Sequence, residues 1–562
     1  MSKVIWKKRD LSKNNSLEKE LGVPKLISEL LSQRGINDFE SAKAFFRPSL
    51  NNLHDPFLMN QMKEAVIRIN KAKLNNEPIM IYGDYDVDGT TAVSLMYLFL
   101  SNFFENIIPY MPDRYKEGYG ISINGINFAK EKGINLIIAL DCGIKAVENV
   151  RYANENKIDF IICDHHKPGI ELPNAVAILN PKKSNCNYPF KDLCGCGIGF
   201  KLVQALSMQW DINFDIVTDY LDLVAIATVS DLVPIVGENR ILCYHGMKKL
   251  NETNKPGLKK FLSLSKSSIN TSDISFKIAP RINSAGRIDH SLEAFKLLTY
   301  NEIIDVEKQF IKIEKFNENR RLIDEETTKE AIKIVENSKI KSNTTVVSSE
   351  NWHKGVIGIV ASRLIENYYK PTIVFTSSGD NYVGSVRSVR DFDVYKTLEM
   401  SKKYIVNFGG HKYAAGVTVS KSKFNEFKNE FEKIVSVQLK TDQKQRVFFY
   451  DLELDLKDIT LKVLRIINQM SPFGSGNSKP MFKTCRCLIK GNPERVGRED
   501  KHLKLEIGDN NNNSFRAIAF GKGYMYDDIK KSDSLDILYS IEENSWNGES
   551  QIQLKIKDIV VN

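Results

Sequence analysis

Three short apolar runs, each leading into a polar turn, constrain the fold of this chain more than any other feature. They lie in PIMIYGDYD, INLIIALDCGI and IDFIICDHHKPG, between residues 75 and 185. Segments with helical character, such as KAVENVRYANENK, separate the runs. Short β-rich runs separated by helical segments predict a parallel α/β sheet.

Potential metal ligands follow each of the three runs. In an open α/β sheet, ligands gather at the carboxyl ends of the strands, so these side chains should share one edge. Asp231, which ends the buried helix expected in DYLDLVAIATVSDLVPI, could join them. The side chains that follow the runs are Asp84, Asp86 and Asp88, then Asp141, then Asp164, His165 and His166.

This mixture of carboxylates and imidazoles suits divalent cations. Mg²⁺ and Mn²⁺ both accept oxygen ligands, and the imidazole nitrogens favour Mn²⁺. Two such cations about 3.5–4 Å apart, bridged by a carboxylate, would activate water and stabilise a displaced oxygen. The sequence therefore predicts hydrolysis of a phosphoester or a phosphoanhydride.

Other interpretations of these groups exist. The acidic turn has the spacing that starts a calcium-binding loop, but the twelfth position from Asp84 is Leu95, where that loop needs glutamate. A single aspartate after a strand is most often a helix N-cap, and an isolated histidine pair is usually a polar surface feature. Their occurrence after three successive strands favours a metal site over three separate accidents.

Composition limits the function only loosely. A chain of 562 residues should contain roughly three or four domains. The hydrophobic content of 42% and charged content of 27% are ordinary for a soluble globular protein, and the net charge of +9 permits a polyanionic partner. No apolar run is long enough to span a bilayer, and the N-terminus lacks a signal-peptide core. We therefore expect a cytoplasmic protein that is not in a membrane.

The eight cysteines should be free thiols in a reducing compartment. The close pairs Cys194/Cys196 and Cys485/Cys487 have C-x-C spacing, whereas zinc sites usually show C-x2-C or wider pairs. A structural zinc site is therefore not expected.

The pattern along the chain predicts five consecutive parts. An N-terminal helical segment, residues 1–45, precedes an α/β domain at 46–302. A long, charged, exposed helix at 303–340 connects it to a second α/β domain at 341–444. Short strands with Asn-rich and Asn-Gly turns predict a small β-barrel at 445–562.

Several motifs resemble a known family. DYDVDG, DCG, CDHH and VSDLVPI resemble successive motifs of the DHH phosphoesterase superfamily. PDRYKEGYG, APRINSAGR, HKGVIGIVASR, GSVRS, FGGHKYAAG and SPFGSGN extend the resemblance to the RecJ family of single-strand-specific 5′→3′ DNA exonucleases, from about residue 45 onward. The resemblance implies a DHH domain, a DHHA1 domain and an OB-fold, a β-barrel that binds nucleic acids.

The resemblance also implies roles for residues at the metal site. His166 would lie beside the scissile phosphate, where it would either stabilise the transition state or support the metal ligands from outside. Asp84 would orient a ligand or act on water. Some superfamily members carry a histidine two positions before Asp84, but here that residue is Tyr82. Asp141 would bridge the two cations, whose ligands would be Asp86, Asp88, Asp141, His165 and Asp231.

For the substrate, the resemblance implies a pocket for the DNA 5′ end made by Arg114, Ser385 and Arg387, where arginine can grip a phosphate with two hydrogen bonds. Arg281 and Arg287 would contact a phosphate, unless they form structural ion pairs. Further implied substrate contacts are Gly409 and Gly410, which let backbone approach closely, and His411, which is otherwise a satisfied polar group.

The expected barrel would bind single strands through stacked aromatic residues and a basic groove. The aromatic candidates could equally be barrel core, and a run of basic residues is usually a solvated face. The candidates are Phe515, Phe520, Tyr524 and Trp546, beside Arg495, Arg498, Lys501 and Lys504.

The expected function is metal-dependent 5′→3′ degradation of single-stranded DNA in recombination and repair. The resemblance implies a monomer that works beside a single-strand-binding protein and a RecQ-type helicase. One alternative is a DHH-family phosphodiesterase acting on short oligoribonucleotides or cyclic dinucleotides, which would not need the C-terminal barrel. Another is a catalytically dead nucleic-acid-binding scaffold, which the complete set of expected ligands disfavours. A pyrophosphatase would need no barrel.

Overall fold

The computed structural model describes residues 4–10, 17–265, 267–338, 342–546 and 549–562, without the side chains of residues 545, 546, 549 and 550. The chain divides into two compact units, and both are discontinuous in sequence. The first contains residues 1–5, 54–231 and 246–446, and the second contains 6–53, 232–245 and 447–562. The five consecutive domains expected from the sequence stay a prediction.

The first sheet of the first unit is parallel throughout, as predicted. Its order is β3-β2-β4-β5-β6, and its strands β2 and β4 are buried on both faces, which explains their unbroken apolar sequences. The strands are β2 (Ile79–Gly83), β3 (Ile107–Tyr110), β4 (Leu136–Leu140), β5 (Asp159–Cys163) and β6 (Ala177–Leu179).

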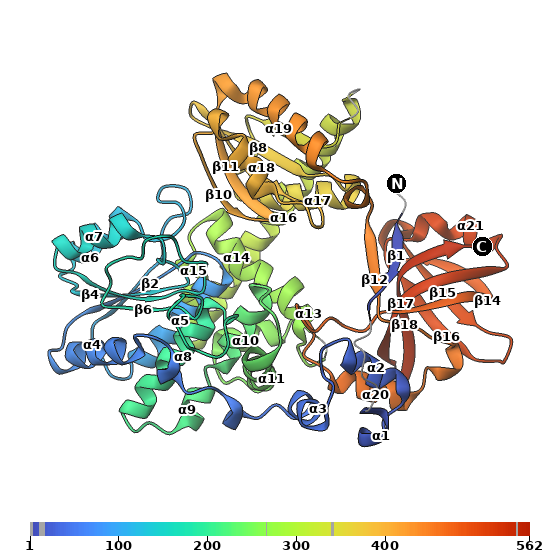
Figure 1. Cartoon of the computed structure of the whole chain (residues 1–562), viewed down its shortest axis with the longest axis horizontal. Helices are drawn as coiled ribbons and strands as arrows, with labels where there is room; N and C mark the ends of the chain where they lie inside the picture. The colour runs from blue at the N-terminus through green and yellow to red at the C-terminus, as the bar shows by residue number, and fades with distance from the viewer. Residues whose placement is uncertain (1–3, 11–16, 266, 339–341, 547–548) are drawn as a thin grey trace. The chain divides into compact units, whose positions relative to one another are not determined.

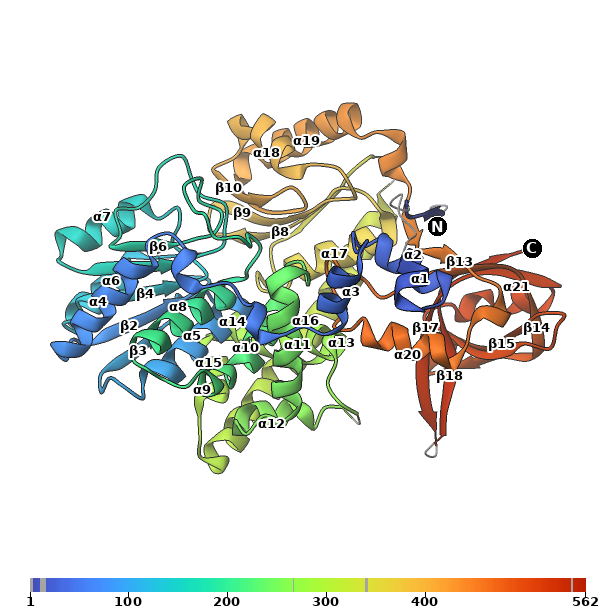
Figure 2. The ribbon, with the colours of Figure 1, turned by 60° about the horizontal axis from the view of Figure 1, so that its bottom comes forward.

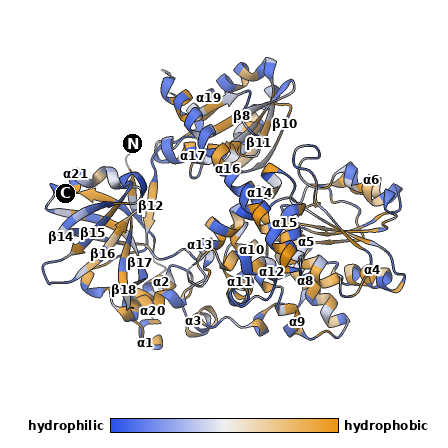
Figure 3. Cartoon of the chain, turned by 180° about the vertical axis from the view of Figure 1, so that it is seen from behind, coloured by the Kyte–Doolittle hydropathy of each residue, from blue (hydrophilic) through white to orange (hydrophobic). Residues whose placement is uncertain are grey.

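Helices cover both faces of this sheet (Figure 1). Helices α6 and α7 supply the apolar side chains against one face, and α5 and α8 pack against the other. Hydrophobic residues dominate α5, which is buried along most of its length (Figure 3). The helices around the sheet are α4 (Met62–Leu74), α5 (Val87–Leu100), α6 (Ile123–Glu131), α7 (Val147–Glu155), α8 (Gly195–Gln209), α9 (Phe214–Thr218) and α10 (Leu221–Ser230), after the short η2 (Pro56–Leu58).

A helical region follows and ends in the long helix predicted from the charge pattern. That helix is α16 (Ile303–Asn337), with 35 residues. The elements before it are α11 (Gly237–Asn251), α12 (Pro256–Leu262), α13 (Thr271–Asp273), the π-helix η3 (Ile274–Ile278), α14 (Ala279–Ile288) and α15 (Leu292–Thr299).

The second sheet of the first unit is mixed. Its order is β10-β11-β9-β8-β7, with β7 and β8 parallel and the other neighbours antiparallel. Its strands are β7 (Thr345–Ser349), β8 (Thr372–Ser378), β9 (Asn381–Arg387), β10 (Asn407–His411) and β11 (Ala414–Ser420). Its helices are α17 (Ile357–Tyr368), α18 (Val394–Met400) and α19 (Phe424–Gln438), with the short η4 (Lys402–Tyr404), η5 (Lys421–Lys423) and η6 (Thr441–Lys444).

The second unit contains the predicted barrel. The strand order is β13-β14-β15-β16-β18-β17, and β14 also pairs with β17, which closes a barrel of the strands β14 to β18. Strands β17 and β18 extend past the other barrel strands (Figure 2). The strands are β13 (Leu452–Glu453), β14 (Phe482–Val496), β15 (His502–Gly508), β16 (Ser514–Ala519), β17 (Ser534–Trp546) and β18 (Glu549–Val561). The helices are α20 (Leu461–Gln469) and α21 (Tyr526–Lys530), with η7 (Leu456–Asp458), η8 (Arg498–Asp500) and η9 (Gly523–Met525).

The N-terminal segment packs on this barrel and is not wholly helical. It begins with strand β1 (Ile5–Lys8), which pairs with β12 (Val447–Tyr450). The sequence did not indicate this strand because its partner lies more than 400 residues away along the chain. The helices that follow share the barrel's hydrophobic core. They are α1 (Leu17–Leu21), α2 (Lys25–Ser32) and α3 (Phe39–Phe46), before η1 (Leu50–Asn52).

Two further observations concern the whole described part of the chain. None of the eight cysteines, all of which are described, forms a disulfide, as predicted. Among the described helices, none combines the length and the apolar character that a membrane crossing requires.

Candidate metal centre

The acidic turn after β2 starts helix α5. Asp86 is the N-cap of this helix, and its side chain accepts a hydrogen bond from the amide of Gly89 (3.0 Å). The N-cap interpretation of an aspartate after a strand is therefore correct for Asp86. A carboxylate in this position is stabilised by the positive end of the helix dipole. One of its oxygens is thereby fixed in place.

Asp88 is the second residue of α5 and is held by a second helix. The amides of Gly195 and Cys196, at the start of α8, donate to its two carboxylate oxygens at 2.6 and 2.8 Å. Two backbone hydrogen bonds fix the plane of this carboxylate. The geometry depends on the C-G-C sequence at 194–196, which the sequence analysis considered only as a possible zinc motif.

Asp141 occupies a strained position at the end of β4. Its backbone is left-handed (φ +61°), and its amide donates to the carbonyl of Cys163 at the end of β5 (2.8 Å). A Cβ atom at Gly195 would lie 2.6 Å from the Asp141 Oδ1. Only glycine fits beside this carboxylate, so Gly195 is a site residue that the sequence analysis missed. Its one signal was a glycine at the start of a helix.

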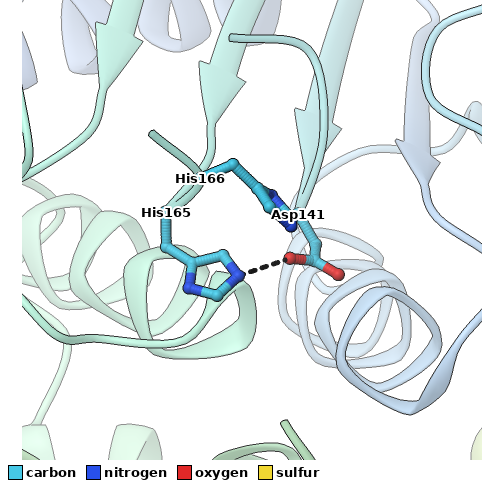
Figure 4. A group of neighbouring side chains, drawn as sticks. All are labelled: Asp141, His165 and His166. Carbon is cyan, nitrogen blue, oxygen red and sulfur yellow. Dashed lines mark ion pairs between the residues drawn. The ribbon is translucent and has the colours of Figure 1, made fainter. Parts of the chain in front are cut away.

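His165 faces three carboxylates from three elements. Its Nε2 lies 3.2 Å from Asp141 Oδ1, 3.6 Å from Asp231 Oδ2 and 4.0 Å from Asp88 Oδ2. Figure 4 shows Asp141 and His165 directed toward each other from neighbouring strand ends, with His166 beside them. Asp231 follows the last residue of α10, as expected.

The predicted ligands thus gather at one edge of the sheet. Three groups have ligand atoms within 4.8 Å of one another, and Asp141 and His165 each belong to two of them. The groups are Asp84, Asp86 and Asp141; Asp88, His165 and Asp231; and Asp141, His165 and His166.

The electrostatics of this edge favour a bound cation. Burial raises the pKa of Asp141 and of Asp84 far above the usual range, and neighbouring carboxylates raise both pKa values further. Burial, with repulsion from Asp88 and Asp86, raises the pKa of Asp231 to about 9. Burial also lowers the pKa of His165 to about 3, which keeps its imidazole neutral. Crowded carboxylates beside a neutral imidazole are the donor set of a divalent cation.

Unpaired atoms support the same conclusion. Oδ1 of Asp84, Oδ1 of Asp141 and Nε2 of His165 are buried and have no hydrogen-bond partner within the described part of the chain. Buried polar atoms without partners are costly and rare in folded proteins. The residues at this edge therefore fit one or more divalent cations.

Comparisons with known proteins agree with this architecture. Family models match residues 78–228 (DHH family, N-terminal domain), 341–437 (DHHA1 domain) and 450–558 (RecJ OB domain). The single-stranded-DNA-specific exonuclease RecJ of Bacillus subtilis is 36% identical, over 100% of this chain and 71% of that protein. RecJ of Dickeya dadantii is 30% identical, over 98% of each chain. This chain belongs to the RecJ family.

Solved RecJ structures have the same fold. The structure of RecJ in complex with Mn²⁺ from Thermus thermophilus matches with a TM-score of 0.86 and 23% identity, covering 100% of this chain and 80% of that chain. A structure of exonuclease RecJ bound to manganese matches with a TM-score of 0.61 and 26% identity, covering 70% of this chain and all of that chain. The predicted architecture of DHH, DHHA1 and OB-fold regions is confirmed.

The second histidine of the RecJ-type DHH motif is oriented by hydrogen bonds. Asp164 Oδ1 lies 2.8 Å from His166 Nδ1 and accepts from the His166 amide, while Asp164 Oδ2 accepts from the amide of Ile144. The hydroxyl of Tyr119 lies 3.2 Å from Nε2 and 3.4 Å from Nδ1 of the same ring. Asp164 therefore positions His166 rather than offering a ligand itself. Tyr119 was not among the residues predicted from the sequence, although it lies inside the PDRYKEGYG motif.

A second cluster of the first unit is basic. Burial, together with Arg114, Arg320 and Arg387, lowers the pKa of Arg287 to about 9. No carboxylate among the described residues forms an ion pair with Arg114, Arg287 or Arg387. Arg387 Nη1 donates to Ser385 Oγ (3.0 Å), and Arg287 Nη1 donates to the carbonyl of Gly355 (2.8 Å). Uncompensated arginines from separate segments form a suitable pocket for an anion.

Arg281 does not belong to this pocket. Its guanidinium forms an ion pair with Glu314 of α16 and donates to the carbonyl of Lys277 (2.8 Å). The structural ion pair, one of the two interpretations considered for Arg281 and Arg287, is therefore present for Arg281. A contact of Arg281 with phosphate stays a prediction that this geometry disfavours.

The predicted residues of the second α/β region come close to the metal centre. The rings of His411 and His166 stack with their centroids 6.4 Å apart. Gly410 has a φ of +142°, and a Cβ atom there would crowd Ala415, whereas a Cβ at Gly409 would meet nothing within 4 Å. Both glycines are exposed in β10, so their backbone is accessible to a ligand.

The aromatic candidates of the barrel separate into two groups. Phe515 is partly buried and packs against the barrel core, which favours its structural interpretation. Phe520 and Tyr524 are 54% and 56% exposed, with Lys555 over the first ring and Lys522 over the second. The side chain of Trp546 lies outside the described residues.

The basic stretch of the barrel is largely paired. Arg495 bonds to Asp527 (2.9 Å) and Lys504 to Glu494 (3.3 Å). Arg498 and Lys501 both lie near Glu499, at 4.0 and 2.5 Å. This surface is therefore less positive than the sequence alone suggests.

Proposed function

We propose that this chain is a metal-dependent exonuclease that degrades single-stranded DNA from its 5′ end. The observation that carries the proposal is the cluster at the edge of the first sheet, where buried carboxylates crowd beside a neutral imidazole and several of their atoms have no hydrogen-bond partner among the described residues. The full-length relationship to RecJ supports the same activity. Mn²⁺ or Mg²⁺ would be the cofactor, as solved RecJ structures with each of these ions support.

The proposed ligands of two cations are those predicted from the sequence. When bound, such cations activate a water molecule and stabilise the oxygen that leaves phosphorus. The chain itself prepares the site: the α8 amides orient Asp88, and the left-handed backbone directs Asp141 toward His165. These ligands are Asp86, Asp88, Asp141, His165 and Asp231. Asp84 lies close to Asp86 and Asp141.

His166 is proposed to act on the substrate. Asp164 occupies its Nδ1, so Nε2 is the nitrogen that can face a phosphate oxygen. The Tyr119 hydroxyl, within 3.4 Å of both ring nitrogens, also restricts the ring. A positioned imidazole donor would stabilise the charge that develops on the non-bridging oxygens.

The arginine pocket supports the 5′→3′ polarity. Arg114, Arg287 and Arg387, with Ser385, provide several donors to one anion, as a terminal phosphate requires. An end pocket close to the metal centre would allow cleavage near a 5′ terminus only. Gly409, Gly410 and His411 of β10 are proposed to contact the strand between these two places.

The wider setting is also a proposal. An enzyme restricted to single strands needs another activity to open a duplex, which supports joint action with a RecQ-type helicase and a single-strand-binding protein. The role in recombination and repair follows from this activity. We further propose a monomer that works in the cytoplasm, where chromosomal DNA is available to a bacterial-type nuclease.

The experiment that tests the function uses single-stranded DNA labelled at either end, with Mn²⁺ or Mg²⁺. We expect early release of the 5′ label, no attack on a matched duplex or RNA, and no activity in Asp141→Ala. Degradation of short RNA without attack on long DNA would instead favour a small-substrate phosphodiesterase. Tight DNA binding without cleavage under either metal would contradict the proposal.

A further inference from the structure

Asp231 differs from the other proposed ligands in how the chain continues after it. Asp231 ends a segment of the first compact unit, and Leu232 begins a segment of the second unit, which also contains the barrel. Leu232 is 69% exposed and has a left-handed backbone (φ +60°). A non-glycine residue keeps such a conformation only where its surroundings impose it. The residues that follow Leu232 are held in place by several contacts, which could supply this constraint.

Those residues lie against the loop with the sequence SPFGSGN, at 471–477. The amide of Ile235 donates to the carbonyl of Ser475 (2.7 Å), and Ile235 is buried. A Cβ at Gly474 would lie 2.5 Å from Ile235 Cδ1. A Cβ at Gly476 would lie 3.2 Å from Pro234 Cβ and 3.2 Å from Val236 Cγ1. The two glycines therefore permit a close contact between the loop and the segment after Asp231.

The loop is itself held rigidly. The side-chain amide of Asn477 donates to the carbonyls of Met470 and Pro472, both at 2.9 Å, and its oxygen accepts from Arg34 Nε (3.0 Å). Buried polar networks in which each group is satisfied fix a single conformation. The loop therefore has little freedom to follow the segment that it contacts.

Arg240, further along the segment that starts at Leu232, forms a second contact with the loop and the residue before it. Its guanidinium is buried and donates to the carbonyls of Met470, Ser471 (3.0 Å each) and Phe45 (2.9 Å). The segment that starts at Leu232 thus contacts the loop through Ile235 and again through Arg240. Two attachments on one short segment fix its direction as well as its position.

We propose that the loop at 471–477 positions Asp231 for metal binding. The segment held by the loop is the covalent continuation of Asp231, which caps the end of α10, so a shift of residues 234–236 would be passed along the chain to Asp231. The inference rests on the proposed metal site and assigns to the SPFGSGN motif a role in that site, in addition to any structural role in the barrel unit. Groups that orient a metal ligand typically change metal affinity about 10–100-fold when they are altered.

The test measures Mn²⁺ binding directly, by electron paramagnetic resonance of free Mn²⁺ in titrations of the full chain. In Gly476→Ala, the new methyl group would press on Pro234 and Val236. We expect the dissociation constant of one Mn²⁺ to rise about tenfold, with unchanged binding of the other. High Mn²⁺ should restore exonuclease activity, which a folding defect would not allow.

The matched control is Gly491→Ala. Gly491 has nearly the same backbone angle as Gly476 (φ +69° against +71°), but a Cβ there meets nothing within 4 Å. Gly491→Ala therefore reproduces the backbone strain of Gly476→Ala without a contact like that with Pro234 and Val236. If Gly476→Ala does not fold, Gly474→Ala replaces it, because Gly474 has no left-handed strain and its methyl group would press only on Ile235.

The outcomes distinguish the two proposals. Normal Mn²⁺ binding in the 474 and 476 variants, with weakened binding in Asp231→Asn, would overturn the positioning role and leave the metal site intact. Equal weakening in Gly476→Ala and Gly491→Ala would also overturn it. Absence of Mn²⁺ binding in the unaltered chain would overturn the proposed function as well.

Discussion

The sheet edge of the first unit and the barrel surface of the second are both charged, but they hold their charges differently. At the sheet edge, no lysine or arginine of the described residues forms an ion pair with Asp84, Asp88 or Asp141. On the barrel, Arg495 and Lys504 each have a carboxylate partner. Crowded charges of one sign require a ligand, whereas paired surface charges contribute little by themselves. The sheet edge therefore indicates its ligand far more specifically than the barrel does.

The largest expected effect comes from the shared carboxylate. Asp141→Asn keeps the size of the side chain and removes its charge, so we expect kcat/KM on single-stranded DNA to fall at least about a thousandfold, equivalent to about 4 kcal/mol. Mn²⁺ binding should weaken in parallel. Asp533→Asn, an exposed site on the barrel, is the control and should change neither quantity. Retained activity in Asp141→Asn would contradict the conclusion that the sheet edge, unlike the barrel surface, requires a bound ligand.

The next effect tests how closely α8 approaches the carboxylates. Gly195→Ala would displace Asp141, and a displacement of about 1 Å can cost about a hundredfold in rate. Gly199→Ala is the control, since it lies in the same helix and a Cβ there is 3.3 Å from one methyl group of Leu140. Steady-state kinetics of both variants provide the measurement. Equal activities would mean that Gly195 only allows the helix to start.

The basic pocket gives a third comparison, between unpaired and paired arginines. In Arg387→Gln, we expect the preference for a 5′-phosphate over a 5′-hydroxyl end to fall about tenfold, because a charge-assisted hydrogen bond contributes about 1.5–3 kcal/mol. Arg281→Gln should leave this preference unchanged, since Arg281 is paired with Glu314. Competition between a substrate with a 5′-phosphate and one with a 5′-hydroxyl measures this preference. A loss of preference in Arg281→Gln would restore Arg281 as a substrate contact.

The dependence of folding stability on pH tests how strongly the crowded carboxyl groups of the sheet edge disfavour their charged forms. The folded-state pKa of Asp231 is raised to about 9 and that of Asp88 to about 6, so both carboxyls hold their protons more tightly when folded. The metal-free chain should therefore lose stability as pH rises from about 4 to about 9. We expect Tm in EDTA to fall by about 1 °C per kcal/mol lost, because the entropy of unfolding grows with chain length, and saturating Mn²⁺ to reduce the fall. A flat Tm in EDTA would contradict the raised pKa values.

The smallest effect is expected on the barrel. Phe520→Ala should weaken binding of single-stranded DNA by about 1 kcal/mol, the lower end for a stacked base. Phe515→Ala should instead lower Tm, because Phe515 packs against the core. Fluorescence anisotropy and thermal unfolding distinguish the two outcomes. If Phe520→Ala leaves the affinity unchanged, the exposed aromatic side chains do not contribute to binding.

The parallel sheet, the long helix and the gathering of carboxylates and imidazoles at one sheet edge were accessible from sequence because each depends on local pattern. Buried strands such as β2 read as unbroken apolar runs, and their carboxyl ends share an edge by topology. The barrel was predicted from strand length and turns, which are also local. Strand β1 was not predicted, since its partner β12 is distant in sequence.

By itself, the sequence determined which chemical groups meet at the sheet edge, because strand order and side-chain type suffice for that. Only the tertiary structure decided what surrounds them. The amides of α8 on Asp88, the space beside Gly195, the Glu314 partner of Arg281 and the loop that contacts the segment after Asp231 all join residues far apart in the chain. Such contacts follow from how elements pack, and periodicity along the chain carries no information about them.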